Sequence, residues 1–354
     1  MVRDLKSSRI LGIMSGTSLD GLDMAYCYFS RNDSVWKYNI EKAATIPYPA
    51  DLADSLENAI RMTGVELVKL DHTYGKWIGW ESKKFLTQYK LKPDFIASHG
   101  HTVFHQPTEG FTLQIGNGHD IHTVTGIPVI CDFRSGDLAL GGNGAPLVPA
   151  GDEYLFGDYS YCLNLGGFSN ISFRKDNKRI AFDICPVNMG LNFLAGKNGQ
   201  SYDKDGETGR KGKIIALLLE RLNKLEYYKL DAPKSLGREW FLKYMKPYLN
   251  EHSDINNTLR TLYEHIAIQI SYTLNKHNSG NVLVTGGGAK NKFLMELIEQ
   301  KTSCKIVIPD YELIDFKEAM IFAFLAYLRI NGINNVFASV TGASGDHSAG
   351  VIYK

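Results

Sequence analysis

The sequence of 354 residues has few cysteines, no long apolar run and no excess of charge of either sign. Its five cysteines include no Cys-x-x-Cys pair, which argues against a disulfide framework and against a zinc site. The longest clearly apolar run, AMIFAFLAYL at 319–328, is too short for a bilayer, which takes roughly 20 residues. The opening residues lack the apolar core of a signal peptide. We therefore expect a soluble, cytoplasmic protein with no membrane partner.

The charges of the chain are balanced, with 39 Lys and Arg residues against 38 Asp and Glu residues. A net charge of +1 gives no reason to expect nucleic acid as a partner. The composition is ordinary for a globular protein, and the length allows one large or two medium domains with a sizeable core. Composition thus excludes partners without identifying a function.

Two familiar nucleotide motifs are also missing, since the chain has neither a P-loop nor an opening strand–Gly-x-Gly-x-x-Gly–helix unit. Residues 11–29, LGIMSGTSLDGLDMAYCYF, instead place a small polar loop between two strand-like runs. Backbone N–H groups in such a glycine-rich turn can cradle a phosphate, and nearby carboxylates can hold Mg²⁺. A plain hairpin turn has the same composition, so both interpretations stay open for this loop alone.

The same pattern of strand, Gly-Ser-Asn loop and strand returns at 161–175, YCLNLGGFSNISFRK. Two such hairpins indicate two related halves. A loop rich in glycine and proline at 141–152 separates them. We predict an α/β protein with an N-terminal domain at 1–145 and a C-terminal domain at 146–354.

A third glycine-rich turn, NVLVTGGGAKN at 281–291, follows a strand and precedes a helix. It would let a flat base lie against the backbone, although a tight strand-to-helix turn explains it equally well when taken alone. Two phosphate hairpins and this turn together resemble the actin-like ATPase and sugar kinase superfamily. That resemblance implies two actin-like (ribonuclease H-like) domains with a central nucleotide cleft.

A closer resemblance runs through nearly the whole chain. The blocks GIMSGTSLDGLD, SHGHTVFH, CDFRSGDLALGGNGAPLVP, LNLGGFSNIS, SLGREWF and VTGAS occur in order. Together they resemble the anhydro-N-acetylmuramic acid kinase family. The resemblance implies an enzyme that uses ATP, Mg²⁺ and water to open 1,6-anhydro-N-acetylmuramic acid and to phosphorylate O6. It also implies a small amino sugar as the partner, and a homodimer.

The resemblance also assigns residues to the site. Asp183 matches the catalytic carboxylate, although local sequence favours a cap of the next helix. Arg134 with Asp137 follows a strand and can grip a carboxylate or form a structural salt bridge. The sugar-binding residues are His99, Asn117, Arg134, Asn143 and Glu318; the histidine can instead be structural, the asparagines can form turns and the glutamate can support its helix.

Nucleotide binding is assigned to the two hairpins and the late turn. The predicted residues are Ser15, Gly16, Thr17, Ser18, Asp20, Gly21, Asp23, Gly166, Gly167, Gly286, Gly287, Gly288 and Asn291. Asp20 and Asp23 are the candidate Mg²⁺ ligands, directly or through water.

Several positions depart from the family pattern where the sugar is expected to lie: His101, Asn143, Ile184, Cys185, Val187 and Asn192. These departures leave two alternatives open. One is a related amino-sugar kinase with a different substrate, and the other is a non-catalytic, actin-like nucleotide switch. Retention of Asp183 and the lack of a partner domain argue against the switch.

Overall fold

The computed structural model describes residues 5–16, 19–33, 35–276 and 279–354. Its contacts divide the chain into a first unit, Met1–Leu155 with Phe316–Lys354, and a second unit, Phe156–Asp315. This division differs from the predicted domains 1–145 and 146–354. The end of the chain returns to the first unit because its last strand pairs there and because its long helix packs on the first strand.

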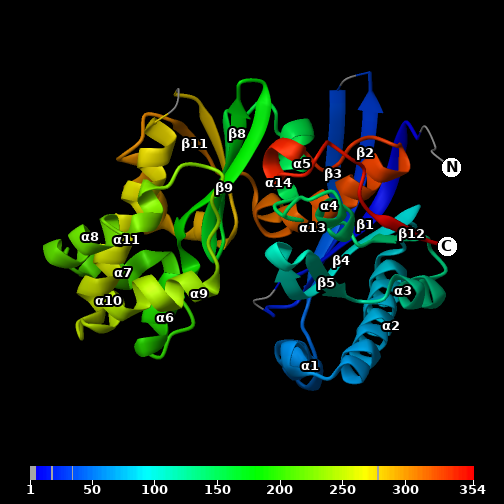
Figure 1. The fold of residues 1–354 in the computed structure, drawn as a ribbon, viewed down its shortest axis with the longest axis horizontal. Helices are drawn as coiled ribbons and strands as arrows, with labels where there is room; N and C mark the ends of the chain where they lie inside the picture. Colours follow the sequence, from blue (N-terminus) through cyan, green and yellow to red (C-terminus); the bar gives the residue numbers. More distant parts are fainter. Residues whose placement is uncertain (1–4, 17–18, 34, 277–278) are drawn as a thin grey trace. The chain divides into compact units, whose positions relative to one another are not determined.

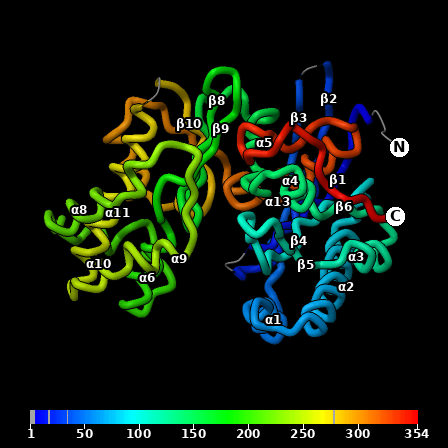
Figure 2. The backbone as a smooth tube through the Cα atoms, in the orientation of Figure 1, coloured from blue at the N-terminus to red at the C-terminus, as the bar shows by residue number. Residues whose placement is uncertain are grey.

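The first unit is built on one sheet of seven strands among the described residues, in the order β12-β6-β4-β1-β2-β3 with β5 on β4. The strands are β1 (Ser7–Ser15), β2 (Leu22–Asn32), β3 (Val35–Ile46), β4 (Phe95–Gln106), β5 (Phe111–Ile115), β6 (Val129–Cys131) and β12 (Val351–Tyr353). β1, β2 and β3 form an antiparallel meander, whereas β4 and β6 run parallel to β1. In Figure 2 the C-terminal end lies beside β6.

Helices bury the faces of this sheet. They are α1 (Ala50–Asn58), α2 (Gly64–Tyr89), α3 (Gly118–Thr125), α4 (Ser135–Ala139), α5 (Val148–Leu155), α13 (Tyr311–Ile330) and α14 (Ala338–Thr341), with 3₁₀ turns η1 (Ala59–Arg61) and η2 (Pro107–Glu109). A reciprocal capping box between Thr63 and Glu66 starts α2, and an αL residue, Lys90, ends it. α2 and α3 pack together (Figure 1). Residues 319–328 of α13 are buried on every side, as expected for a helix that is apolar all round.

The second unit repeats the first-unit topology with a five-stranded sheet in the order β11-β10-β7-β8-β9. Its strands are β7 (Tyr161–Leu165), β8 (Phe168–Lys175), β9 (Lys178–Pro186), β10 (Asn281–Thr285) and β11 (Lys305–Val307). β7, β8 and β9 again form an antiparallel meander, and β10 and β11 run parallel to β7. When the five strands are numbered in chain order from β7, they lie in the order 3-2-1-4-5, with the first three antiparallel and the last two parallel to strand 1. This is the ribonuclease H-like topology. The prediction of two related α/β halves is therefore confirmed.

The helices of the second unit enclose one apolar core against its sheet (Figure 1). They are α6 (Asn188–Lys197), α7 (Glu207–Lys211), α8 (Ala216–Asn223), α9 (Arg238–Trp240), α10 (Lys246–Asn250), α11 (Ile255–Asn275) and α12 (Lys292–Glu299), with short turns η3 (Lys204–Gly206), η4 (Glu226–Lys229), η5 (Phe241–Met245) and η6 (Gly287–Lys290). Successive side chains of β7 point to opposite faces of the sheet. Tyr161, Leu163 and Leu165 point into the core, and the residues between them face away.

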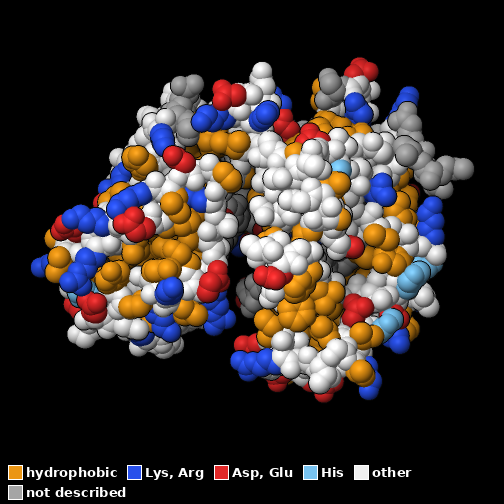
Figure 3. All heavy atoms as spheres, viewed as in Figure 1, with side chains coloured by type: hydrophobic (Ala, Val, Ile, Leu, Met, Phe, Trp, Pro, Cys, Tyr) orange, Lys and Arg blue, Asp and Glu red, His pale blue; other side chains and the backbone are white. Residues whose placement is uncertain are grey.

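Within the described ranges, none of the helices combines the length and the apolar character that a membrane crossing requires. Lys and Arg side chains are interspersed with Asp and Glu side chains on the visible face of each unit (Figure 3). The face seen in Figure 3 is therefore consistent with the balanced charge of the sequence.

Candidate active site

Ser15 ends β1, and its side chain is buried instead of facing an open loop. Its Oγ accepts a hydrogen bond from the Tyr48 hydroxyl at 2.8 Å and lies 3.0 Å from Nδ1 of His101. Ser15 therefore joins Tyr48 and His101 through one hydroxyl, which can both donate and accept hydrogen bonds. The Tyr48 hydroxyl also lies 3.1 Å from that of Tyr74. The hydroxyl predicted to bind nucleotide is thus engaged in a buried network.

After Ser15, Leu19 donates its N–H to the Gly16 carbonyl at 3.2 Å. Gly21 has a φ of +147°, and a Cβ there would collide with β3, so the turn requires glycine. The predicted nucleotide-binding residues Thr17 and Ser18 lie outside the described residues. Among the described residues of the loop, Gly21 thus serves the packing of the chain against β3.

Arg134 starts α4 directly after β6, and its guanidinium is held from two sides. Nε and Nη2 donate to Nε2 of His99 at 3.0 and 2.8 Å, and Nη1 donates to the Gly144 carbonyl at 2.7 Å. His99 in turn donates from Nδ1 to the Gly100 carbonyl. Burial and the adjacent guanidinium hold the pKa of His99 well below its ordinary value. His99 is therefore a neutral support for Arg134, as in the structural alternative for this residue.

Asp137 fixes the loop that Arg134 contacts. Its carboxylate is fully buried and accepts from the Gly144 N–H at 2.6 Å and from the Thr341 hydroxyl at 2.7 Å. Asn143 donates its backbone N–H to the Thr341 carbonyl, while its side chain stays exposed. The VTGAS block is thus a structural brace for the Arg134 loop, and Asn143 keeps a side chain available to a ligand.

Three charged residues of the first unit, Glu318, Asp23 and Arg134, influence one another electrostatically. Surrounding protein raises the pKa of the Glu318 carboxyl and Asp23 raises it further, whereas Arg134 lowers it. Glu318 itself remains open to solvent. Asp23 accepts from the Thr45 hydroxyl at 2.6 Å, and Asp20 is exposed. The Glu318 carboxyl is thus influenced by the charges of both Arg134 and Asp23.

Asn117 behaves as a turn former. Its Oδ1 accepts from the N–H groups of His119 and Asp120 at the start of α3, and its Nδ2 donates to Asp71. A polar cavity of about 170 Å³ lies beside it. Its lining includes Asp71, His99, Gln114, Asn117, Asp132 and Tyr353. Asn117 therefore caps α3 and also lines this cavity, and its predicted role in sugar binding stays a prediction.

The buried His101 makes the first unit sensitive to acid. Burial lowers the pKa of His101 to about 4 from an ordinary value of 6.5. The unfolded chain therefore binds more protons between these values, and the stability that His101 contributes is lost as the pH falls below 6.5. Lowering the pH from 7.5 to 5 should reduce the free energy of unfolding of the wild type by about 2 kcal/mol more than that of His101→Gln. Urea unfolding of the first unit at both pH values measures this difference. His119→Gln, at an exposed histidine of α3, is the control and should follow the wild type; equal losses in all three proteins would contradict this prediction.

In the second unit the β7–β8 turn and the start of α6 are joined. Val187 and Met189 donate their N–H groups to the Gly167 carbonyl at 2.8 and 3.1 Å, and Asn188 donates to the Gly166 carbonyl at 3.2 Å. Gly167 itself is exposed. The glycine hairpin is thus presented at the surface with its carbonyl groups already satisfied by the helix.

The triple glycine lies against the end of β7. A Cβ on Gly286, which has a φ of +80°, would lie 2.6 Å from Oδ1 of Asn164, and one on Gly288 would lie 2.7 Å from Cβ of Leu165. Gly287 is exposed. Two of the three glycines therefore allow close approach of protein backbone, and the third leaves an open surface on the turn.

Asn291 caps α12 and ties it to α11. Its Oδ1 accepts from the Leu294 N–H at 3.0 Å, and its Nδ2 donates to the Tyr263 hydroxyl at 2.8 Å. The side chain predicted to contact nucleotide is therefore engaged within the second unit.

A row of polar side chains crosses the second sheet. Thr285 of β10 pairs with Asn164 of β7, Asn164 pairs with Asn170 of β8, and Asn170 pairs with Asp183 of β9. Residues directly opposite one another project from the same face. Asp183 thus shares a face with two asparagines, which the sequence analysis did not select. The polar positions of the alternating runs LNL and SNIS were the signal for them.

Asp183 is half-buried, and its Oδ2 accepts from the Leu236 N–H at 2.8 Å. It does not cap the next helix, because the N-cap of α6 is Val187 and no side chain caps that helix. Burial raises the pKa of the Asp183 carboxyl from 3.8 to about 6, and the Leu236 bond opposes that rise. A carboxylate with a pKa this near neutral is suited to accept a proton during a reaction.

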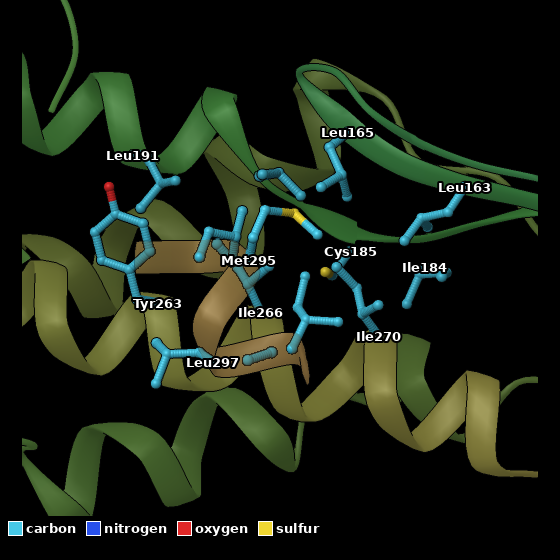
Figure 4. Close-up of a cluster of buried hydrophobic side chains, with 14 of the residues drawn as sticks. Leu163, Leu165, Ile184, Cys185, Leu191, Tyr263, Ile266, Ile270, Met295 and Leu297 are labelled. Carbon is cyan, nitrogen blue, oxygen red and sulfur yellow. The ribbon is translucent and has the colours of Figure 1, made fainter. Parts of the chain in front are cut away.

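The residues next to Asp183 that depart from the family pattern lie mainly in the core of the second unit. Ile184, Cys185 and Val187 are at most 3% exposed and pack in the apolar cluster of the second unit, where Figure 4 shows the first two. Val187 has a φ of −118°, outside the left-handed region that favours glycine. Asn192 is exposed on α6. The expectation that these three apolar side chains remodel a sugar site is therefore wrong, since they face the interior.

Two sheets of ribonuclease H-like topology, each with a glycine-rich hairpin after its first strand, define a protein of the actin-like ATPase and sugar kinase class. The family model described as anhydro-N-acetylmuramic acid kinase matches residues 8–354. The chain belongs to that family.

Individual relatives agree with the family assignment. The chain is 38% identical to the anhydro-N-acetylmuramic acid kinase of Aliivibrio fischeri, with 98% of this chain and 99% of the relative covered. It is 39% identical to that of Vibrio cholerae, with 97% of each chain covered. A ROK family glucokinase of Streptomyces griseus, solved with glucose and AMPPNP, aligns with a TM-score of 0.42 and 11% identity over 90% of this chain and 98% of that one. This distant likeness adds nothing to the family assignment.

Proposed function

We propose that the protein uses ATP and water to convert 1,6-anhydro-N-acetylmuramic acid into N-acetylmuramic acid 6-phosphate, with Asp183 as the general base. A water oxygen bonds to the anomeric carbon and gives its proton to Asp183. The bond from that carbon to O6 breaks as O6 takes the γ-phosphoryl group of ATP, and ADP leaves. The observation that carries the proposal is the half-buried Asp183 carboxylate, whose pKa is raised to about 6.

The glycine hairpins supply what phosphoryl transfer needs, namely positioning and stabilisation of charge. We propose that the turns around Gly16, Gly166 and Gly286–Gly288 bind the phosphates and the adenosine of ATP. Among the described residues no group of three or more His, Cys, Asp or Glu side chains is arranged to hold a metal. Mg²⁺ needs only one or two carboxylates besides water and phosphate, so Asp20 and Asp23 are proposed as its ligands, directly or through water. Mg²⁺ would supply charge neutralisation at the phosphates.

Arg134 is proposed to bind the lactyl carboxylate of the sugar. Two of its N–H groups have no partner among the described residues, and a planar pair of donors suits a carboxylate. Asn143 and Glu318, which are both exposed, are proposed to bind sugar hydroxyls.

Because ATP is the phosphoryl donor, we place the reaction in the cytoplasm. We also propose that the protein is a homodimer, which light scattering tests.

The substrate is tested by mass spectrometry of products. Purified protein with ATP and Mg²⁺ is given the anhydro sugar, N-acetylmuramic acid or N-acetylglucosamine in separate reactions. We expect a phosphorylated product from the anhydro sugar and at most traces from the others. Phosphorylation of an unbridged sugar alone would establish an altered amino-sugar kinase, and ATP binding without any product would establish a nucleotide switch. None of the described contacts favours either alternative.

A further inference from the structure

Asp183 lies on an edge strand, yet its backbone is covered. β9 is the last strand in the order of the second sheet, so one side of it has no strand partner. On that side the Tyr227 hydroxyl donates to the Asp183 carbonyl at 2.7 Å, and the Asp183 N–H donates to the Lys234 carbonyl at 3.2 Å. The segment 227–236 therefore replaces a neighbouring strand at this one residue.

The same segment also holds the side chain, because the Leu236 N–H donates to Oδ2 of Asp183 at 2.8 Å. Three hydrogen bonds from 227–236 thus fix the carbonyl, the amide and one carboxylate oxygen of Asp183. The register of β8 and β9 shifts immediately after Asp183, where Ile184 is the extra residue. A bulge bends a strand and redirects a side chain, so the position needs such external support.

Contacts within residues 227–236 hold this segment in one conformation. The Lys234 ammonium donates to the carbonyls of Leu230 and Tyr227 at 2.9 and 3.3 Å and lies 4.8 Å from the centre of the Tyr227 ring. The Tyr227 ring also contacts Trp240 edge to face. Tyr227 is therefore fixed at both its ring and its hydroxyl, which suits a rigid support for another group.

We propose that residues 227–236 form a clamp that positions Asp183, with Tyr227 as a positioning residue. The clamp occupies Oδ2 and leaves Oδ1 to receive the proton of the attacking water. This inference rests on the proposed role of Asp183 as general base. The base must point at one water, and small misplacements of a catalytic group lower rates strongly.

The titratable groups next to Asp183 in the second unit are Tyr227 and Lys234, whose hydroxyl and carbonyl bond the Asp183 backbone, and Cys185, which lies two residues along the same strand with its side chain in the core. Burial raises the pKa of Tyr227, raises the pKa of Cys185 to about 12 and lowers the pKa of Lys234. The Leu236 hydrogen bond lowers the pKa of Asp183. A loosened clamp weakens that bond, so the pKa of Asp183 rises when Tyr227 loses its hydroxyl.

Tyr227→Phe tests the clamp, because it removes one hydroxyl and keeps the ring. The full-length enzyme is assayed with ATP and the anhydro sugar from pH 5 to 8. We expect kcat to fall about tenfold or more with little change in KM for ATP, and the acid limb of the pH profile to move to higher pH. Lys234→Met, which opens the clamp without touching the Asp183 side chain, should act in the same direction.

The matched control is Tyr228→Phe. The Tyr228 hydroxyl bonds Nε2 of His265 at 2.9 Å, so this variant loses a hydrogen bond from the neighbouring tyrosine without touching Asp183. We expect kcat within about threefold of the wild type and an unmoved acid limb. If Tyr227→Phe and Tyr228→Phe changed kcat and the acid limb equally, or if Tyr227→Phe behaved like the wild type, the clamp proposal would be overturned while the proposed function would stand. Failure of the wild type to make product would overturn the proposed function as well.

Discussion

Replacing Asp183 with asparagine is expected to lower kcat by about 10²–10⁴-fold, the usual contribution of a general base. The amide oxygen can still accept the Leu236 N–H, so the fold of β9 should be retained. In the wild type, kcat/KM should fall on the acid side with an apparent pKa of about 6, because burial raises the pKa of Asp183 to that value and the protonated carboxyl cannot accept a proton. Steady-state kinetics between pH 5 and 8 measure both effects.

Asp176→Asn is the control for this variant, since Asp176 is an exposed residue in the turn of the same β8–β9 hairpin. It should match the wild type in rate and pH profile. An Asp183→Asn enzyme that keeps more than about a tenth of wild-type kcat would exclude Asp183 as the base.

Gly12→Ala is expected to destabilise the first unit by about 3 kcal/mol or more. A Cβ on Gly12 would overlap the carbonyl oxygen of Ala319 and lie 2.9 Å from Cβ of Ala323, so α13 would have to move away from β1. Ala319 follows Glu318, and the shift would therefore also displace that carboxylate and reduce activity. Thermal unfolding and kcat at a temperature where the variant is folded measure the two effects.

Gly64→Ala is the matched control, because a Cβ on this glycine at the start of α2 meets nothing within 4 Å. It should be neutral or stabilising by up to about 1 kcal/mol. If both alanine variants were equally stable, the close packing of β1 on α13 would be disproved.

The repeated architecture was predictable because its signals are local. Apolar runs and turn residues indicate the two hairpins and the strand before Gly286 directly. The return of residues 316–354 to the first unit could not be predicted from the sequence. Because α13 is apolar all round, its sequence does not indicate on which sheet it packs.

Several of the predicted site side chains also make contacts within the protein that the sequence did not indicate. Ser15, Asn117 and Asn291 have residue types suited to ligands, but a hydroxyl or amide also satisfies buried neighbours and helix ends, and only three-dimensional contacts distinguish these uses. The role of Tyr227 could not be predicted, because it is 44 positions from Asp183 in sequence and acts on a backbone carbonyl.

The central claim, that water opens the anhydro ring as O6 is phosphorylated, is tested most directly in ¹⁸O-water with rapid quenching and mass spectrometry. The account predicts one heavy oxygen at the anomeric carbon of the phosphorylated product, formed before exchange and absent with Asp183→Asn. A phosphorylated sugar without the heavy oxygen at the earliest times, or an intact anhydro ring in the product, would contradict it.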